Sequence, residues 1–146
     1  MKAKEYLRQL YRLEVVIKQK MKEKEELYYL LRGISGIDYS REKVQASRPN
    51  EASFAKILEK ASRLDEEINS EIDKFIDLKH LIIKQIQSMD EHNYIELLYK
   101  RYVEFKDFST IADEMNYSDR QIFRLHGMAL KAFEKRWHTM SYKYML

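Results

Sequence analysis

Three basic side chains in the last third of the sequence have the types and spacing to bind nucleic acid. Arg120 and Arg124 are four residues apart and Lys131 follows seven residues later, so on an α-helix all three share one face. An arginine can form two parallel hydrogen bonds with a guanine edge, whereas a lysine further along the helix reaches phosphate. These residues predict a helix that contacts double-stranded DNA.

The apolar residues around them predict a helix-turn-helix that holds this helix in place. A first short helix has one apolar face formed by Ile111, Ala112 and Met115. Tyr117 then breaks the helical period. The period resumes on a second helix with Ile122, Leu125 and Ala129. One straight helix would scatter these residues around its surface, whereas two helices that meet at a tight turn bring them into one core.

The residues of the turn predict the same corner. Ser118 precedes Gln121 by three residues, which is the capping-box pattern that begins a helix. Asn116 lies where the turn needs a left-handed residue, and asparagine tolerates that conformation better than most residues. We expect Asp107 to cap the first helix. A helical corner that only packs within an all-α protein would carry the same pattern.

The face opposite this core is the candidate DNA-binding surface. It consists of Ser118, Asp119, Arg120, Gln121, Phe123, Arg124, Gly127 and Lys131. The charge distribution favours the same surface, because residues 91–117 carry three basic and six acidic groups and residues 118–146 carry six basic and two acidic groups. Phosphate attraction supplies most of the non-specific affinity for DNA, so the C-terminal part is expected to face the duplex. A close approach of DNA or of another helix would explain Gly127, since glycine is a poor helix former.

Part of the sequence resembles a known DNA-binding module. The segment SDRQIFRLHGMALKAFEK resembles the recognition helix of bacterial sigma factor region four, with a capped start at Ser118, an aliphatic residue at Ile122 and the pair Ala129 and Leu130. The preceding IADEMNYS resembles the first helix and turn of that family, which usually has glycine at the position of Asn116. The resemblance covers about residues 91–137. It implies base or phosphate contacts by Asp119, Arg120, Gln121, Phe123 and Arg124.

Over its whole length the chain resembles small regulators encoded by phages and prophages of Gram-positive bacteria, of the RinA and ArpU type. The shared features are the opening AKEYL, the segment IDYSREKVQ and the ending YSDRQIFRLHGMALK. Those proteins are regarded as DNA-binding regulators of late phage genes. The resemblance therefore implies a transcriptional regulator in the cytoplasm of a bacterial host.

Two long apolar stripes predict a coiled coil in the N-terminal 89 residues. Apolar side chains recur with a period near 3.5 in residues 3–32 and again in residues 53–88. Neither helix can bury its stripe alone, so we expect a long antiparallel hairpin over residues 1–89, with a loop at about 33–52. The stripe is wider than two helices can cover. A second copy of the chain or the C-terminal domain is expected to cover the rest.

The helix ends of the hairpin are expected at particular residues. Gly33 and Gly36 should end the first helix, and Ser53 is a plausible cap of the second helix. Pro49 should lie before that helix and not inside it.

Residues 90–146 are expected to form the small helix-turn-helix domain. Asp90 is the expected cap of a support helix over residues 91–103, and its aromatic residues are expected to fill a core rather than to stack single-stranded bases. A last seam, formed by Leu130, Phe133, Trp137, Met140 and Tyr144, is expected either to dock on the hairpin or to mediate self-association.

The composition places the chain in the class of helix-rich, non-membrane proteins. Of its 146 residues, 35% are charged, three are glycine and one is proline. It contains no run of about 18 apolar residues that could span a membrane, and its charged N-terminus does not resemble a signal peptide. The absence of cysteine excludes disulfides and thiolate metal sites and fits a reducing cytoplasm.

No pattern of catalytic residues stands out, so we expect a protein that is not an enzyme and needs no cofactor or metal. The sequence has no phosphate-binding glycine loop, and its four histidines are not at metal-ligand spacing. His126 lies on the second helix of the corner and is expected to contact DNA or to pack.

Three functions fit these observations. The leading hypothesis is a sequence-specific, double-stranded DNA-binding transcriptional regulator of phage or prophage genes, in which the coiled coil forms a homo-oligomer. The first alternative is a phage DNA-packaging recognition subunit, similar to a small terminase. The second is a protein-interaction adaptor that contacts RNA polymerase.

Overall fold

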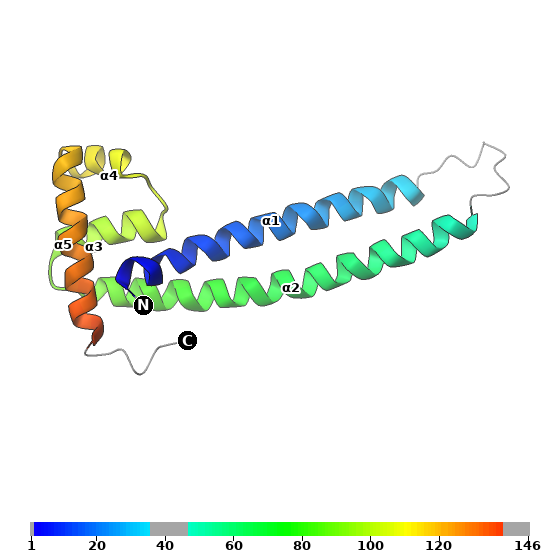
Figure 1. Ribbon diagram of the computed structural model, residues 1–146, viewed down its shortest axis with the longest axis horizontal. Helices are drawn as coiled ribbons and strands as arrows, with labels where there is room; N and C mark the ends of the chain where they lie inside the picture. The colour runs from blue at the N-terminus through cyan, green and yellow to red at the C-terminus, as the bar shows by residue number, and fades with distance from the viewer. Residues whose placement is uncertain (1, 36–46, 139–146) are drawn as a thin grey trace. The chain divides into compact units, whose positions relative to one another are not determined.

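The computed structural model describes residues 2–35 and 47–138 (Figure 1). Its elements are α1 (Ala3–Ser35), α2 (Ser47–Gln87), α3 (His92–Leu98), the π-helical turn η1 (Tyr99–Val103), α4 (Phe108–Met115) and α5 (Asp119–His138). No strand occurs in the described ranges, so the predicted all-α fold class is confirmed.

The chain divides into two compact units. Unit 1 combines residues 1–13 with residues 75–146, and unit 2 comprises residues 14–74. The predicted boundary at residue 89 does not coincide with this division, because the first turns of α1 and the last turns of α2 share a core with α3, η1 and α5.

Unit 2 is an antiparallel pair of helices. Lys20 Nζ on α1 lies 3.5 Å from Glu67 Oε2 and 3.9 Å from Glu71 Oε1 on α2. One turn later on α1, Lys24 Nζ donates to Asp65 Oδ1 at 2.8 Å, earlier on α2. The partners move backwards along α2 as α1 advances, which is the antiparallel arrangement predicted for the hairpin. Its buried apolar residues are Ile17, Leu31, Ala61, Leu64 and Ile68.

The helix ends in unit 2 differ from the predicted ones. The second helix begins at Ser47 and not at Ser53, which lies inside it. Pro49 lies in the first turn of α2, where the missing N–H of proline has no helical acceptor to lose. The first helix continues through Gly33 to Ser35. Gly36 and the rest of residues 36–46 lie outside the described residues.

The core of unit 1 is built from elements far apart in the sequence. Fully buried side chains come from both ends of the unit: Leu7, Leu10, Ile82, Ile86, Leu98, Ala129 and Phe133. The ring of Tyr6 stacks on Phe133 at 6.2 Å, and the N–H of Ala3 donates to Glu134 Oε1 at 3.0 Å. The start of the predicted C-terminal seam therefore packs inside unit 1. The side chain of Trp137 and residues 140 and 144 lie outside the description.

The predicted support helix starts and ends differently from expectation. Its N-cap is Glu91 and not Asp90, and no side chain accepts a hydrogen bond there. After Leu98 the backbone widens into η1, where the N–H of Glu104 donates to the carbonyl of Tyr99 at 3.0 Å. Tyr102 and Val103, at the end of this wider turn, are both buried. The backbone then leaves the turn through Phe105, which has a positive φ of 59°.

The corner between α4 and α5 forms as its residues predict. Leu97, Ile111, Ala112 and Ile122 are buried together, with Phe108, Met115, Tyr117 and Leu125 packed around them. Ala129 was expected in this core, but it is buried in the other cluster with Phe133. The reason is its position nearly two turns beyond Ile122, which carries it past the end of the short α4.

The caps of this corner match the predicted chemistry. The N–H of Thr110 donates to Asp107 Oδ1 at 2.7 Å at the start of α4. At α5 the N–H of Gln121 donates to Ser118 Oγ at 3.2 Å, and the N–H of Ser118 donates to Gln121 Oε1 at 2.9 Å. Asn116 has φ 58° and ψ 40°, so it is the left-handed residue that ends α4.

The left-handed turn gives a direct test. Asn116→Ala should lower the free energy of unfolding by about 1 kcal/mol, because a Cβ without a local hydrogen-bonding group is disfavoured at positive φ. Asn116→Gly should change it by less than about 0.5 kcal/mol, because easier geometry is offset by the greater freedom of the unfolded chain. The control is Asn93→Ala inside α3, where alanine is the better helix former. Chemical denaturation of the three variants checks the order, and an Asn116→Ala variant as stable as Asn93→Ala would contradict it.

Candidate nucleic-acid interface

The eight residues predicted to contact DNA all lie on the exposed surface of the corner. Ser118, Asp119, Arg120, Gln121, Phe123, Arg124, Gly127 and Lys131 are each exposed. Their placement follows from the other side of α5, where Ile122 and Ala129 are completely buried and Phe133 is 1% exposed. A helix that buries one face must turn the opposite face outwards.

The basic residues on this face are not neutralised by neighbours. Among the residues that the structure describes, no ion pair involves Arg120, Arg124 or Lys131. The contrast with the preceding segment is clear, because Lys100 and Lys106 both bind Glu114 at 2.7 Å. The unpaired cations of α5 are therefore the ones available to phosphate.

Two of the candidate residues also begin the helix. The side chains of Ser118 and Gln121 bond reciprocally to each other's backbone N–H groups in the capping box. Because the amide oxygen of Gln121 is used there, its amide nitrogen is the group left to contact a ligand.

Phe123 combines exposure with a packing contact. Its side chain is 57% exposed, yet its ring centre lies 5.0 Å from that of Phe108 at the start of α4. The guanidinium of Arg101 in turn lies 4.2 Å from the centre of the Phe108 ring. Phe123 is therefore held in place on the face, where half of it can still meet a ligand.

Gly127 is not explained by a neighbouring helix. A Cβ added at this residue would meet no atom within 4 Å in the described structure. Close approach of DNA remains the prediction for this position.

His126 packs and does not lie on the exposed face. It is 8% exposed, and its Nε2 lies 2.7 Å from the hydroxyl of Tyr102. Burial, together with the nearby charges of Lys4 and Arg101, lowers the pKa of His126 to about 4. The ring is therefore neutral at pH 7, and its Nε2 shares a hydrogen bond with the hydroxyl of Tyr102, in which the tautomer of the ring decides the donor.

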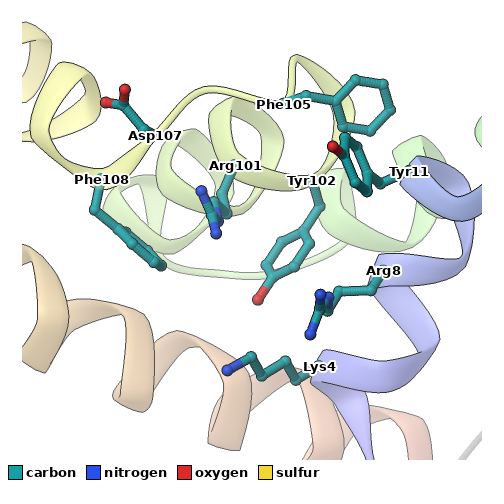
Figure 2. A pocket seen from close by; sticks show the side chains of 8 residues that line it. All are labelled: Lys4, Arg8, Tyr11, Arg101, Tyr102, Phe105, Asp107 and Phe108. Atoms are coloured by element: carbon teal, nitrogen blue, oxygen red, sulfur yellow. The ribbon is translucent and has the colours of Figure 1, made fainter. Parts of the chain in front are cut away.

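Sequence reasoning missed the basic side chains that the fold brings beside α5. Neither Lys4 nor Arg8 was among the residues predicted to contact DNA, but both line the same hollow as Arg101 and Phe108 (Figure 2). Their spacing of four residues on α1 was visible in the sequence, although nothing local places residue 4 beside residue 101.

Metal-binding clusters and membrane-spanning helices are both absent from the described ranges. Residues 2–35 and 47–138 contain no group of three His, Cys, Asp or Glu side chains that could hold a metal ion. None of the described helices is long and apolar enough to cross a membrane.

Comparisons with protein-family models, with curated proteins and with solved structures find no match to this chain. The functional argument therefore depends on the residues and geometry described above.

The buried histidine predicts a loss of stability in mild acid. The unfolded chain binds a proton at His126 near pH 6.5 and the folded chain only near pH 4, so the free energy of unfolding should fall as the pH drops between these values. The lowered pKa values of Asp107 and Glu114 put the loss of their interactions at the acid end of this window or below it.

Urea denaturation at several pH values between 7 and 4 tests this explanation. His126→Gln keeps a side chain that can donate to or accept from Tyr102 but cannot titrate, so its stability should vary less over the window. The matched control is His80→Gln on the exposed surface of α2, which should retain the wild-type loss. Equal pH dependence in wild type and His126→Gln would show that this ring is not the cause.

Proposed function

We propose that the chain is a sequence-specific, double-stranded DNA-binding transcriptional regulator of phage or prophage genes, and that it is not an enzyme. The single observation that carries this proposal is the exposed face of α5, where Arg120, Arg124 and Lys131 have no ion-pair partner in residues 2–35 and 47–138. The capped corner of α4 and α5 supports it, because the two helices hold this face rigidly outwards.

In this proposal α5 enters the major groove with its N-terminal half. The groove is wide enough for one α-helix, and the base edges there distinguish all four base pairs. Arg124 lies one turn after Arg120 and is long enough to reach a guanine edge. Lys131 lies roughly 10 Å further along the axis, at 1.5 Å per residue, and reaches the phosphate backbone.

Self-association is the proposed role of the paired helices. Unit 2 exposes several large apolar side chains, namely Val16, Met21, Tyr29, Leu30, Phe54 and Leu58. A second copy that covers them would place two recognition helices in one assembly, as in helix-turn-helix proteins that bind two half-sites.

The adaptor function is favoured by one observation. Phe123 and Met128, which are 57% and 44% exposed, give α5 an apolar component that a protein partner such as RNA polymerase could cover. An adaptor would bind no duplex even at low salt, which separates it from the leading proposal.

Sequence reading by α5 is tested with two substitutions. Arg124→Ala should weaken binding to the cognate duplex by 1 to 3 kcal/mol, about 5- to 150-fold, and should weaken binding to a scrambled duplex far less. Lys131→Ala should weaken both alike and lower the slope of log K against log salt by about one unit.

Fluorescence anisotropy at several salt concentrations measures both effects, with a cognate duplex first selected from a random pool. An unchanged ratio of cognate to scrambled affinity in Arg124→Ala would refute base reading by this residue.

Self-association through unit 2 is tested by light scattering at micromolar concentration. The chain should be larger than a monomer, and Leu30→Lys together with Leu58→Lys should shift it towards the monomer by placing charges in the apolar contact. Met128→Lys is the control, because Met128 and Leu58 are each 44% exposed but Met128 lies on α5. A wild-type chain that is strictly monomeric, or a double variant that assembles like wild type, would exclude this surface.

A further inference from the structure

Unit 1 contains a hollow of about 340 Å³ between the first turns of α1, the turn η1 and the start of α4 (Figure 2). It is lined by Lys4, Arg8, Tyr11, Arg101, Tyr102, Phe105, Asp107 and Phe108. Figure 2 shows the side chains of Lys4, Arg8 and Arg101 directed into the same space. The lining thus contains three cations and a single carboxylate.

The positive charges of the hollow are not cancelled. Among the described residues, neither Lys4 nor Arg8 takes part in an ion pair. The one carboxylate, Asp107, already accepts the N–H of Thr110 at the start of α4. Like charges brought together without an anion repel each other, so an anionic ligand would stabilise this arrangement.

Arg101 is held in a fixed orientation at the hollow. Its Nη1 donates to the carbonyl of Lys106 at 3.0 Å, and its guanidinium lies 4.2 Å from the centre of the Phe108 ring. A guanidinium that is already held loses little freedom when an anion binds, which favours binding.

The positive potential also acts on the buried groups behind the hollow. Burial is the largest cause of the raised pKa of Tyr102, to about 12, and the charges of Arg101 and Arg8 oppose that rise. Lys4 and Arg101 lower the pKa of His126 in addition to the effect of burial. Arg101 therefore acts on both side chains, together with Arg8 at Tyr102 and with Lys4 at His126.

The hollow adjoins the proposed recognition face. Phe108 lines it, and the ring of Phe108 contacts Phe123, which is exposed on α5. The hydrogen bond from the N–H of Ala3 to Glu134 ties the start of α1 to the same helix. A ligand in the hollow would lie beside α5, where the backbone of a duplex would pass if α5 occupied the major groove.

We propose that Lys4, Arg8 and Arg101 form a phosphate site that holds one backbone phosphate of the duplex while α5 reads the adjoining major groove. Arginine matches a phosphate with its planar fork of donors, and lysine adds a compact charge. The inference rests on the proposed function. A free phosphorylated small molecule would offer the same chemistry, so the experiment separates the two sources.

The test compares duplex binding by Lys4→Gln with Arg8→Gln in one chain against a matched double variant. The control is Lys56→Gln with Lys60→Gln, which removes two exposed cations four residues apart on α2 in unit 2. The Lys4→Gln, Arg8→Gln double variant, called the pocket variant below, should bind cognate and scrambled duplexes about tenfold more weakly than wild type. Its slope of log K against log salt should be lower by about one unit. The control should match wild type in both quantities.

Three outcomes have separate meanings. Wild-type affinity and slope in the pocket variant, with Arg124→Ala still impaired, would overturn the phosphate site and leave the proposed function standing. No duplex binding by the wild-type chain would overturn both. In a parallel titration with adenosine monophosphate followed by NMR, saturable shifts at Tyr102 that the pocket variant abolishes, combined with unimpaired duplex binding, would assign the hollow to a free phosphorylated ligand and overturn the DNA assignment.

Discussion

The burial of one face of α5 is the constraint on which the rest of unit 1 depends. Ile122 at the start of that face closes the core of the corner, and Phe133 near its end fills the core shared with α1 and α2. His126 lies between them, and its Nε2 forms a hydrogen bond with the hydroxyl of Tyr102. Because one helix closes two cores, it cannot rotate without opening both, and its outer face is fixed as a consequence.

This constraint also separates the charges of unit 1. Two acidic residues before α5 make contacts inside the unit, since Glu114 binds Lys100 and Lys106 and Asp107 caps α4. The hydrogen bonds from these lysines lower the pKa of Glu114, so the carboxylate stays charged at neutral pH. Arg120, Arg124 and Lys131 on α5 have no ion-pair partner among the described residues, and neither do Lys4 and Arg8 on α1. These five cations give the surface of unit 1 its positive charge.

Local interactions made the corner and its surface predictable. A capping box, an aspartate cap and a left-handed asparagine act within about four residues, so Ser118, Asp107 and Asn116 could be assigned before the fold was known. The same short range explains two errors. From the sequence, α2 was expected to begin near Ser53 and Asp90 to cap the support helix, but α2 begins at Ser47 and the cap is Glu91. Both helix starts lie outside the periodic apolar stripes, where no local pattern marks the helix end.

The sequence by itself therefore determined the all-α class, the paired long helices and the exposed face of α5, because helical periodicity and capping are local properties. Only the tertiary structure decided that Ala129 joins the second core and that His126 is buried. It alone brought Lys4 and Arg8 beside Arg101. The physical reason is that contacts between residues about a hundred positions apart depend on how whole helices pack, which no short pattern encodes.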